Sequence, residues 1–224
     1  EYLYGSKIKG KEYVNGKLEY EGEYNYNKKW NGKGYNEKGN IIYKLNNGTW
    51  KGREYFDGNI LMYEGGYLNG KWNGKGKEYE YNGKLKFEGE YLDGKKWNGR
   101  GYDENYNMIY DINNGNGKIK EYDDGHLIFE GEYSNGEKNG KGKEYDFDGN
   151  IIFEGEYSNE TRNGKGKEYF FEGNIVFEGE YLNGIKNGNG KEYDYDGKLI
   201  FEGEYLNNLR NGKGKEYING NLIF

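Results

Sequence analysis

The sequence contains no proline and no cysteine, and it has a single histidine among its 224 residues. Without cysteine the chain can form no disulfide, no thiolate nucleophile and no zinc–thiolate site. One histidine excludes paired-histidine chemistry. Hydrophobic residues make up only 33% of the chain and aromatic residues alone 18%, so aliphatic side chains are too few for the core of an ordinary globular domain.

Glycine, tyrosine and asparagine dominate instead, with 41, 27 and 32 copies. A net charge of only -6 and this much tyrosine are unlike a self-repelling disordered chain, so we expect an ordered fold with tyrosine as its main apolar residue. The pI of about 5.2 and the mixed charge disfavour nucleic acid as a partner, since phosphate binding needs a basic stripe. No apolar run approaches the roughly 20 residues of a membrane-spanning helix.

The sequence is an internal repeat. Phe-Glu-Gly-Glu-Tyr begins at four positions spaced 24 residues apart, and weaker copies extend the same register. The ten anchor residues are Tyr20, Tyr43, Tyr63, Phe87, Tyr110, Phe129, Phe153, Phe177, Phe201 and Phe224. The copies at Tyr43 and Tyr110 are degenerate, and each is the second unit of a three-unit block that recurs after 66 to 67 residues.

One unit predicts one β-hairpin. Residues 127–133 alternate apolar and polar residues, as a strand with one apolar face does. Asn135-Gly136 supplies the positive backbone angles of a tight hairpin turn, and residues 141–145 form the return strand. Asp148-Gly149 is a second turn that leads into the next copy. Successive hairpins predict an all-antiparallel meander.

The two faces of this hairpin should differ. Placing Lys141 and Lys143 opposite Glu130 and Glu132 makes a cross-strand ladder of opposite charges, each pair contributing about 0.2–1 kcal/mol.

The same placement puts Gly140 and Gly142 on the face of Phe129, where flat backbone supports an aromatic ring. It also sends Tyr145 to the charged face. Either a bulge near Glu144 resets the alternation, or each face is apolar at a different end of the hairpin.

These residues resemble the MORN repeat (membrane occupation and recognition nexus) over essentially the whole chain, in about ten copies. The Gly190 to Phe201 segment is similar to the variant MORN repeat with a 23–24 residue unit. Three features depart from the usual pattern: tyrosine as the second aromatic residue, asparagine where histidine precedes Gly-Lys-Gly, and one extra residue before the anchor. The resemblance implies an elongated, solenoid-like, single-layer twisted antiparallel sheet of stacked hairpins with an aromatic-lined groove. It also implies a scaffold without enzymatic activity.

We expect residues 1–224 to form a single array of about nine to ten hairpins that is a segment of a longer chain. The ends motivate this expectation, because joining Phe224 to Glu1 through one Glu-Gly would rebuild a complete repeat strand.

Departures from the repeat are the best markers of a local site. Trp30, Trp72 and Trp97 each precede Asn-Gly, where later units carry lysine or arginine. They predict either an aromatic contact patch for a partner or rings that pack on a neighbouring loop. The tyrosines that close the Glu-Gly-Glu-Tyr strands complete the candidate partner-binding set: Tyr91, Tyr133, Tyr157, Tyr181 and Tyr205.

No catalytic, metal-binding or cofactor-binding residue is predicted. The repeated carboxylate pair Glu130 and Glu132 faces lysine and reads as an ion-pair ladder rather than an acid/base pair. Asp146 and Asp148 lack the ligand number of a calcium loop and indicate a turn. No cofactor is expected, and an enzyme is the least favoured class.

The leading functional hypothesis is a non-catalytic scaffold that binds another protein or a second copy of itself, as a homodimer or end to end. Its motive is that a single-layer sheet leaves its aromatic face uncovered. The first alternative is peripheral attachment to membrane phospholipid, which the acidic charge disfavours. The second is carbohydrate or cell-wall binding through stacked aromatic rings. The partner is not identified by the sequence, and a cytoplasmic location is favoured.

Overall fold

The hairpin turns follow from their asparagine and glycine residues. Asn135 and Gly136 both have positive φ angles, 54° and 75°, which is the conformation that the right-handed twist of paired strands favours in a two-residue turn. Asn69-Gly70 and Asn183-Gly184 repeat this geometry. The prediction of Asn-Gly hairpin turns is confirmed. Because the chain reverses at these turns, almost every strand pairs with its neighbour in sequence.

A computed structural model of the chain describes residues 1–57, 60–170 and 173–224. The chain divides into two units, Glu1–Asn107 (unit 1) and Met108–Phe224 (unit 2). The expected all-β antiparallel meander of hairpins is confirmed.

Unit 1 contains a two-stranded sheet (β1–β2), a four-stranded sheet (β3–β6) and the consecutive antiparallel strands β7–β11. Its strands are β1 (Tyr2–Leu3), β2 (Ser6–Lys7), β3 (Lys9–Val14), β4 (Lys17–Asn25), β5 (Lys28–Tyr35), β6 (Ile41–Leu45), β7 (Thr49–Tyr55), β8 (Leu61–Leu68), β9 (Lys71–Tyr79), β10 (Leu85–Leu92) and β11 (Lys95–Tyr102).

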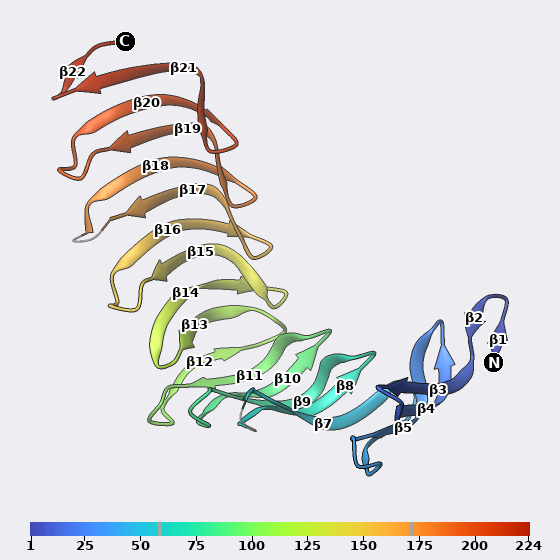
Figure 1. Cartoon of the computed structure of the whole chain (residues 1–224). Helices are drawn as coiled ribbons and strands as arrows, with labels where there is room; N and C mark the ends of the chain where they lie inside the picture. The colour runs from blue at the N-terminus through green and yellow to red at the C-terminus, as the bar shows by residue number, and fades with distance from the viewer. Residues whose placement is uncertain (58–59, 171–172) are drawn as a thin grey trace. The chain divides into compact units, whose positions relative to one another are not determined.

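Unit 2 contains a ten-stranded antiparallel sheet in sequence order from β13 to β22, and Figure 1 shows its hairpins stacked one after another from green to red. Its strands are β12 (Met108–Ile112), β13 (Gly117–Asp123), β14 (His126–Ser134), β15 (Glu137–Tyr145), β16 (Ile151–Ser158), β17 (Thr161–Tyr169), β18 (Ile175–Leu182), β19 (Ile185–Tyr193), β20 (Leu199–Leu206), β21 (Leu209–Ile218) and β22 (Asn221–Leu222).

The charged ladder forms on one face of this sheet, although its register differs in part from the prediction. Lys143 lies opposite Glu130 as expected, and it also faces Glu154 of the next hairpin. Lys141 lies opposite Glu156 rather than Glu132, so that part of the prediction is wrong. A register shift between Gly131 and Tyr133 causes the difference.

The prediction that glycines lie beneath the aromatic rings is confirmed for Gly142 and wrong for Gly140. Gly142 lies beneath Phe129 as predicted, since an added Cβ would meet the ring Cζ at 2.6 Å. Gly140 lies in the shifted region with φ of 106°, beside the Glu132 carboxylate rather than an aromatic ring. Near Glu144 the pairing with β16 shifts register, yet Tyr145 stays on the charged face, where its hydroxyl donates to Glu130 Oε1 at 2.6 Å.

The Asp-x-Asp-Gly segments are turns. The Oδ1 atom of Asp146 accepts hydrogen bonds from the backbone N–H groups of Asp148 (3.0 Å) and Asn150 (2.8 Å). Hydrogen bonds from Asn150 also lower the pKa of Asp146. The carboxylate is therefore used by its own turn, which agrees with the turn interpretation.

Candidate functional site

The face opposite the charged ladder carries a repeated aromatic core. Phe153 is fully buried, and its ring lies across the glycine backbone of its own hairpin: Cβ atoms added to Gly155 and Gly166 would approach Cζ to 2.7 and 2.5 Å. Only glycine leaves room for a ring this close to the backbone. The same arrangement recurs beneath Phe129, Phe177 and Phe201.

Phe129, Phe153 and Phe177 each contact the tyrosines of two hairpins. Phe153 meets Tyr157 of its own strand at a centroid distance of 5.8 Å and Tyr181 of the next hairpin at 5.3 Å, both edge to face. This is the geometry that aromatic pairs prefer. Because Phe177 repeats the pattern with Tyr181 and Tyr205, the rings form a continuous row along the sheet.

A cation covers each ring on its remaining side. The Arg162 guanidinium carbon lies 4.0 Å from the Phe153 centroid, and its Nε donates to Glu144 Oε1 at 3.0 Å. Its Nη1 also reaches Glu168, at 3.2 Å. Burial opposes the ionisation of Glu144, but the hydrogen bonds from Arg162 and Tyr157 and the nearby positive charges together lower the pKa of Glu144. Cation–π contact and ion pairing thus seal the aromatic face with the chain's own side chains.

Three other hairpins of unit 2 place a cation in the same way. The ammonium groups of Lys138 and Lys186 each lie 4.1 Å from their ring centroids, over Phe129 and Phe177. Arg210 lies over Phe201 at 4.4 Å.

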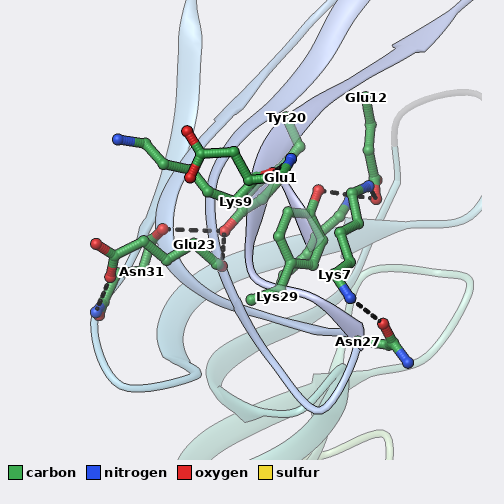
Figure 2. Close-up of polar contacts among 10 residues, drawn as sticks. Glu1, Lys7, Lys9, Glu12, Tyr20, Glu23, Asn27, Lys29 and Asn31 are labelled. Atoms are coloured by element: carbon green, nitrogen blue, oxygen red, sulfur yellow. Dashed lines mark hydrogen bonds and ion pairs between the residues drawn. The ribbon is translucent and has the colours of Figure 1, made fainter. Parts of the chain in front are cut away.

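Unit 1 begins with a variant of this arrangement, built on tyrosine. Glu12 accepts contacts from the ammonium groups of Lys7 (3.0 Å) and Lys29 (2.9 Å), as Figure 2 shows. Burial opposes ionisation of Glu12, but hydrogen bonds from Lys29, Lys7 and Tyr24 lower its pKa to about 2. The Tyr20 hydroxyl donates to backbone carbonyls, and burial raises the pKa of Tyr20 to about 12.

The tyrosines of the candidate partner-binding set belong to this core. Their exposed fractions are 2% for Tyr91, 9% for Tyr133, 5% for Tyr157, 4% for Tyr181 and 3% for Tyr205. The expectation of an open groove lined by these tyrosines is therefore corrected, because the tyrosines pack edge to face against core phenylalanines whose own rings lysine and arginine cover. Whether these tyrosines contribute to partner binding stays a prediction.

The three candidate tryptophans are half-buried but not equivalent. Trp72 lies opposite Tyr67 and stacks on Tyr63 with a centroid distance of 4.1 Å, in the position that a cation occupies elsewhere.

Trp30 and Trp97 are instead extra residues in their strands, since Lys29 and Lys96 pair with Tyr24 and Tyr91. Lys29 and Lys96 are the residues that lie over the rings of Tyr20 and Phe87. The one-residue offset hides this difference in the sequence. A role of the tryptophans in partner binding stays a prediction.

The open concave surface of unit 2 lies on the charged face. A groove of about 1330 Å³ crosses strands β13 to β21. Strands with Glu-Gly-Glu alternate with strands that carry Lys-Gly-Lys or, in β13 and β19, Lys-Ile-Lys and Asn-Gly-Lys. Two rows of mostly alternating charge therefore flank a central row that is glycine in every strand but β13. Lys143, for example, lies 3.9 Å from Glu154, and both side chains keep more than a third of their surface exposed. We call this surface the Glu-Gly-Lys groove.

The sequence analysis identified the charges of this groove but not its importance. The signal was present in the sequence as Glu-Gly-Glu segments that alternate with segments of the type Lys-Gly-Lys. Within the described residues no group of three or more histidine, aspartate or glutamate side chains could hold a metal ion.

Comparison with known proteins identifies the repeat. The MORN repeat, which is a non-enzymatic repeat, matches five segments that together cover half of the chain: residues 63–84, 129–151, 153–175, 177–198 and 201–222. No curated protein matches the sequence.

Among solved structures, the chain is similar to a chain in the crystal structure of TcdB2-TccC3-Cdc42, with 13% identity, a TM-score of 0.21, and coverage of 83% of this chain and 9% of that one. A chain in the crystal structure of TcdB2-TccC3-TEV is similar at 10% identity and a TM-score of 0.18, with coverage of 91% and 13%. The chain thus spans about a tenth of the length of these chains. TM-scores this low do not establish a shared fold. On the five matching segments and the hairpin architecture, the chain belongs to the MORN repeat family.

Proposed function

We propose that this repeat scaffold binds another protein, and that the Glu-Gly-Lys groove of unit 2 is the binding surface. The observation that carries the proposal is the groove itself, about 1330 Å³ in volume and continuous across nine strands, β13 to β21. Its glycine row leaves the backbone bare, so a partner chain can approach the sheet closely.

The charge pattern of the groove supports a protein partner over a uniformly charged ligand. Successive strands present carboxylates and ammonium groups in turn, as Glu154, Lys167 and Glu178 do. A partner with charges of both signs can pair with these groups only in registers that match their alternation, which gives specificity more than raw affinity. A membrane surface needs a polybasic patch instead. No described segment forms a helix with the length and apolarity to cross a bilayer.

Site-specific photo-cross-linking tests the groove. A cross-linking amino acid at Lys167, inside the groove, should capture a protein partner in cells that produce the chain. The same amino acid at Lys198, which lies in a turn outside the groove, is the matched control. Equal capture at both positions would contradict the groove as the binding surface.

Two further measurements separate the alternatives. Size-exclusion chromatography with light scattering reports whether the captured partner is a second copy of the chain. Co-sedimentation with liposomes, with and without anionic lipid, reports membrane attachment, and binding that persists at high salt would replace the proposed protein partner with lipid.

A further inference from the structure

One hairpin of unit 1 is open. β6 and β7 are consecutive strands, but they belong to different sheets. Two backbone hydrogen bonds join them, from Asn46 to Thr49 (2.9 Å) and back (3.0 Å), both beside the turn. Beyond this pair, no backbone hydrogen bond links the two strands within the described residues. The facing edges of β6 and β7 therefore keep unpaired N–H and C=O groups, the usual template for an added strand.

Aromatic rings close this opening on one side only. Tyr43 of β6 and Trp50 of β7 lie 4.5 Å apart, and Trp50 stacks on Tyr67 of β8 at 4.0 Å. On the charged face a hollow of about 1060 Å³ adjoins the two strands, and Ile42, Lys51 and Arg53 are among the residues that line it. Ile42 is 57% exposed. We call the space between β6 and β7, open towards the charged face, the slot.

The charges around the slot are unbalanced. In unit 2 a strand such as β17, with Lys165-Gly166-Lys167, has a Glu-Gly-Glu strand on each side. β7 carries the equivalent Lys51-Gly52-Arg53 but has an acidic neighbour on one side only, where Arg53 pairs with Glu64 at 3.1 Å.

The other side of the slot adds positive charge. β6 carries Lys44, which itself lies opposite Lys33 of β5. Like charges placed opposite each other destabilise strand pairing, so direct pairing of β6 with β7 would place Lys44 among further cations. An incoming strand with two carboxylates on one face would restore the alternation found in unit 2.

We propose that the slot binds an extended acidic segment of a partner protein, of the type Glu-small-Glu, by β-strand addition between β6 and β7. Main-chain hydrogen bonds to the open edges supply the affinity, and the carboxylates pair with Lys51, Arg53 and Lys44. The central small residue fits over Gly52, as glycine fits over glycine in unit 2. This site deepens the proposed scaffold function by assigning a partner chemistry, and it does not use the unit 2 groove.

A labelled peptide tests the slot directly. The probe is a fluorescent octapeptide with the sequence of residues 151–158, Ile-Ile-Phe-Glu-Gly-Glu-Tyr-Ser, titrated into the full chain and followed by fluorescence anisotropy. We expect saturable binding that falls at least tenfold when both peptide glutamates are replaced by lysine. N-methylation of alternate peptide residues should abolish binding, because it removes the N–H donors of an added strand. Binding that survives N-methylation would overturn strand addition.

Charge reversal locates the peptide on the chain. The double change Lys51→Glu with Arg53→Glu should weaken the acidic peptide at least tenfold. The matched control is Lys165→Glu with Lys167→Glu on β17, a strand of unit 2 that is paired on both sides and lies outside the hollow, where we expect less than a twofold change. Equal weakening in the two variants would overturn the assignment.

Two safeguards keep the result decisive. If the β7 variant unfolds, Lys44→Glu on β6 tests the same slot without touching the Arg53–Glu64 pair. Light scattering at increasing protein concentration reports whether a second copy fills the slot, and a dimer that Lys44→Glu abolishes would overturn the partner assignment. Failure of the peptide to bind alongside positive cross-links at Lys167 would reject the slot and leave the groove standing.

Discussion

The closeness of glycine to the aromatic rings gives a sharp prediction for Gly166→Ala. An added Cβ at Gly166 would lie 2.5 Å from Cζ and 2.7 Å from Cε2 of Phe153, whereas unstrained carbon atoms approach to about 3.5–4.0 Å. The ring has little room to retreat, because Arg162 lies 4.0 Å from its centroid on one side and Tyr181 lies 5.3 Å away. Overpacking of this kind lowers the free energy of unfolding by about 1–3 kcal/mol. Replacing glycine by alanine also reduces the conformational entropy of the unfolded chain, which stabilises the fold by about 0.4–1 kcal/mol.

The net expectation for Gly166→Ala is a loss of about 1–2 kcal/mol, which is roughly a tenfold change in the local opening equilibrium. Hydrogen exchange of the β16 and β17 amides is the suitable measurement, since a repeat array need not unfold in one step. Gly10→Ala is the matched control, because its nearest neighbour is the flexible end of Lys7, with Cε at 3.2 Å. It should be neutral or slightly stabilising.

A double-mutant cycle separates ring overlap from a general effect of alanine in a strand. Phe153→Leu removes the ring, so Gly166→Ala should cost at least about 1 kcal/mol less in that background than in the original chain. The reasoning is refuted if Gly166→Ala costs no more than Gly10→Ala, or if its cost is unchanged beside leucine.

Three further predictions concern the side chains of Glu12, Glu160 and Arg162. Glu12 has a folded-state pKa of about 2, below its usual value near 4.5. Its contribution to stability should therefore be complete above pH 4.5 and lost as the pH falls towards 2. In Glu12→Gln, the free energy of unfolding of unit 1 should depend less on pH over this range. Glu160 has a positive φ of 70°, while its carboxylate accepts from the Lys138 N–H at 2.8 Å. Glu160→Ala should therefore destabilise by about 1 kcal/mol more than Glu160→Gly in urea titrations, and equal losses would argue against strain at this turn. Arg162→Met leaves the half-buried Glu144 without its cation and should lower the stability by about 2 kcal/mol, whereas Arg162→Lys should lower it by under about 1 kcal/mol. Similar losses in the two variants, measured by hydrogen exchange, would show that the positive charge is unimportant there.

Local chemistry explains why most of the fold was predictable from the sequence. Asn135-Gly136 determines its turn from two adjacent residues, and the alternation of residues 127–133 determines a strand. The pairing of Phe129 with Gly142 needs only one hairpin. Predictions failed where a bulge changed the register, as at Lys141, because a bulge depends on backbone geometry that a period of two does not encode.

The candidate site was predicted less well, since it depends on contacts between repeats. Arg162 reaches back 18 residues to Glu144, and this pair turns an aromatic face that was expected to be open into a sealed one. The inequivalence of Trp30 and Trp72 arises from one extra residue before the Asn-Gly pair. The slot between β6 and β7 reflects missing carboxylates in a degenerate unit, and the effect of a missing neighbour appears only when the strands are placed in space.

The interlocking of neighbouring hairpins gives the array a direction. Arg162 takes its carboxylate Glu144 from the hairpin before it, while Phe153 takes its closing ring, Tyr181, from the hairpin after it. Each hairpin thus needs a carboxylate from the hairpin before it and a tyrosine ring from the hairpin after it. Hairpins of this kind can join head to tail without limit, but two identical sides cannot satisfy each other. A change in length by whole units preserves every partnership, whereas inverting one unit would break the partnerships at both of its sides.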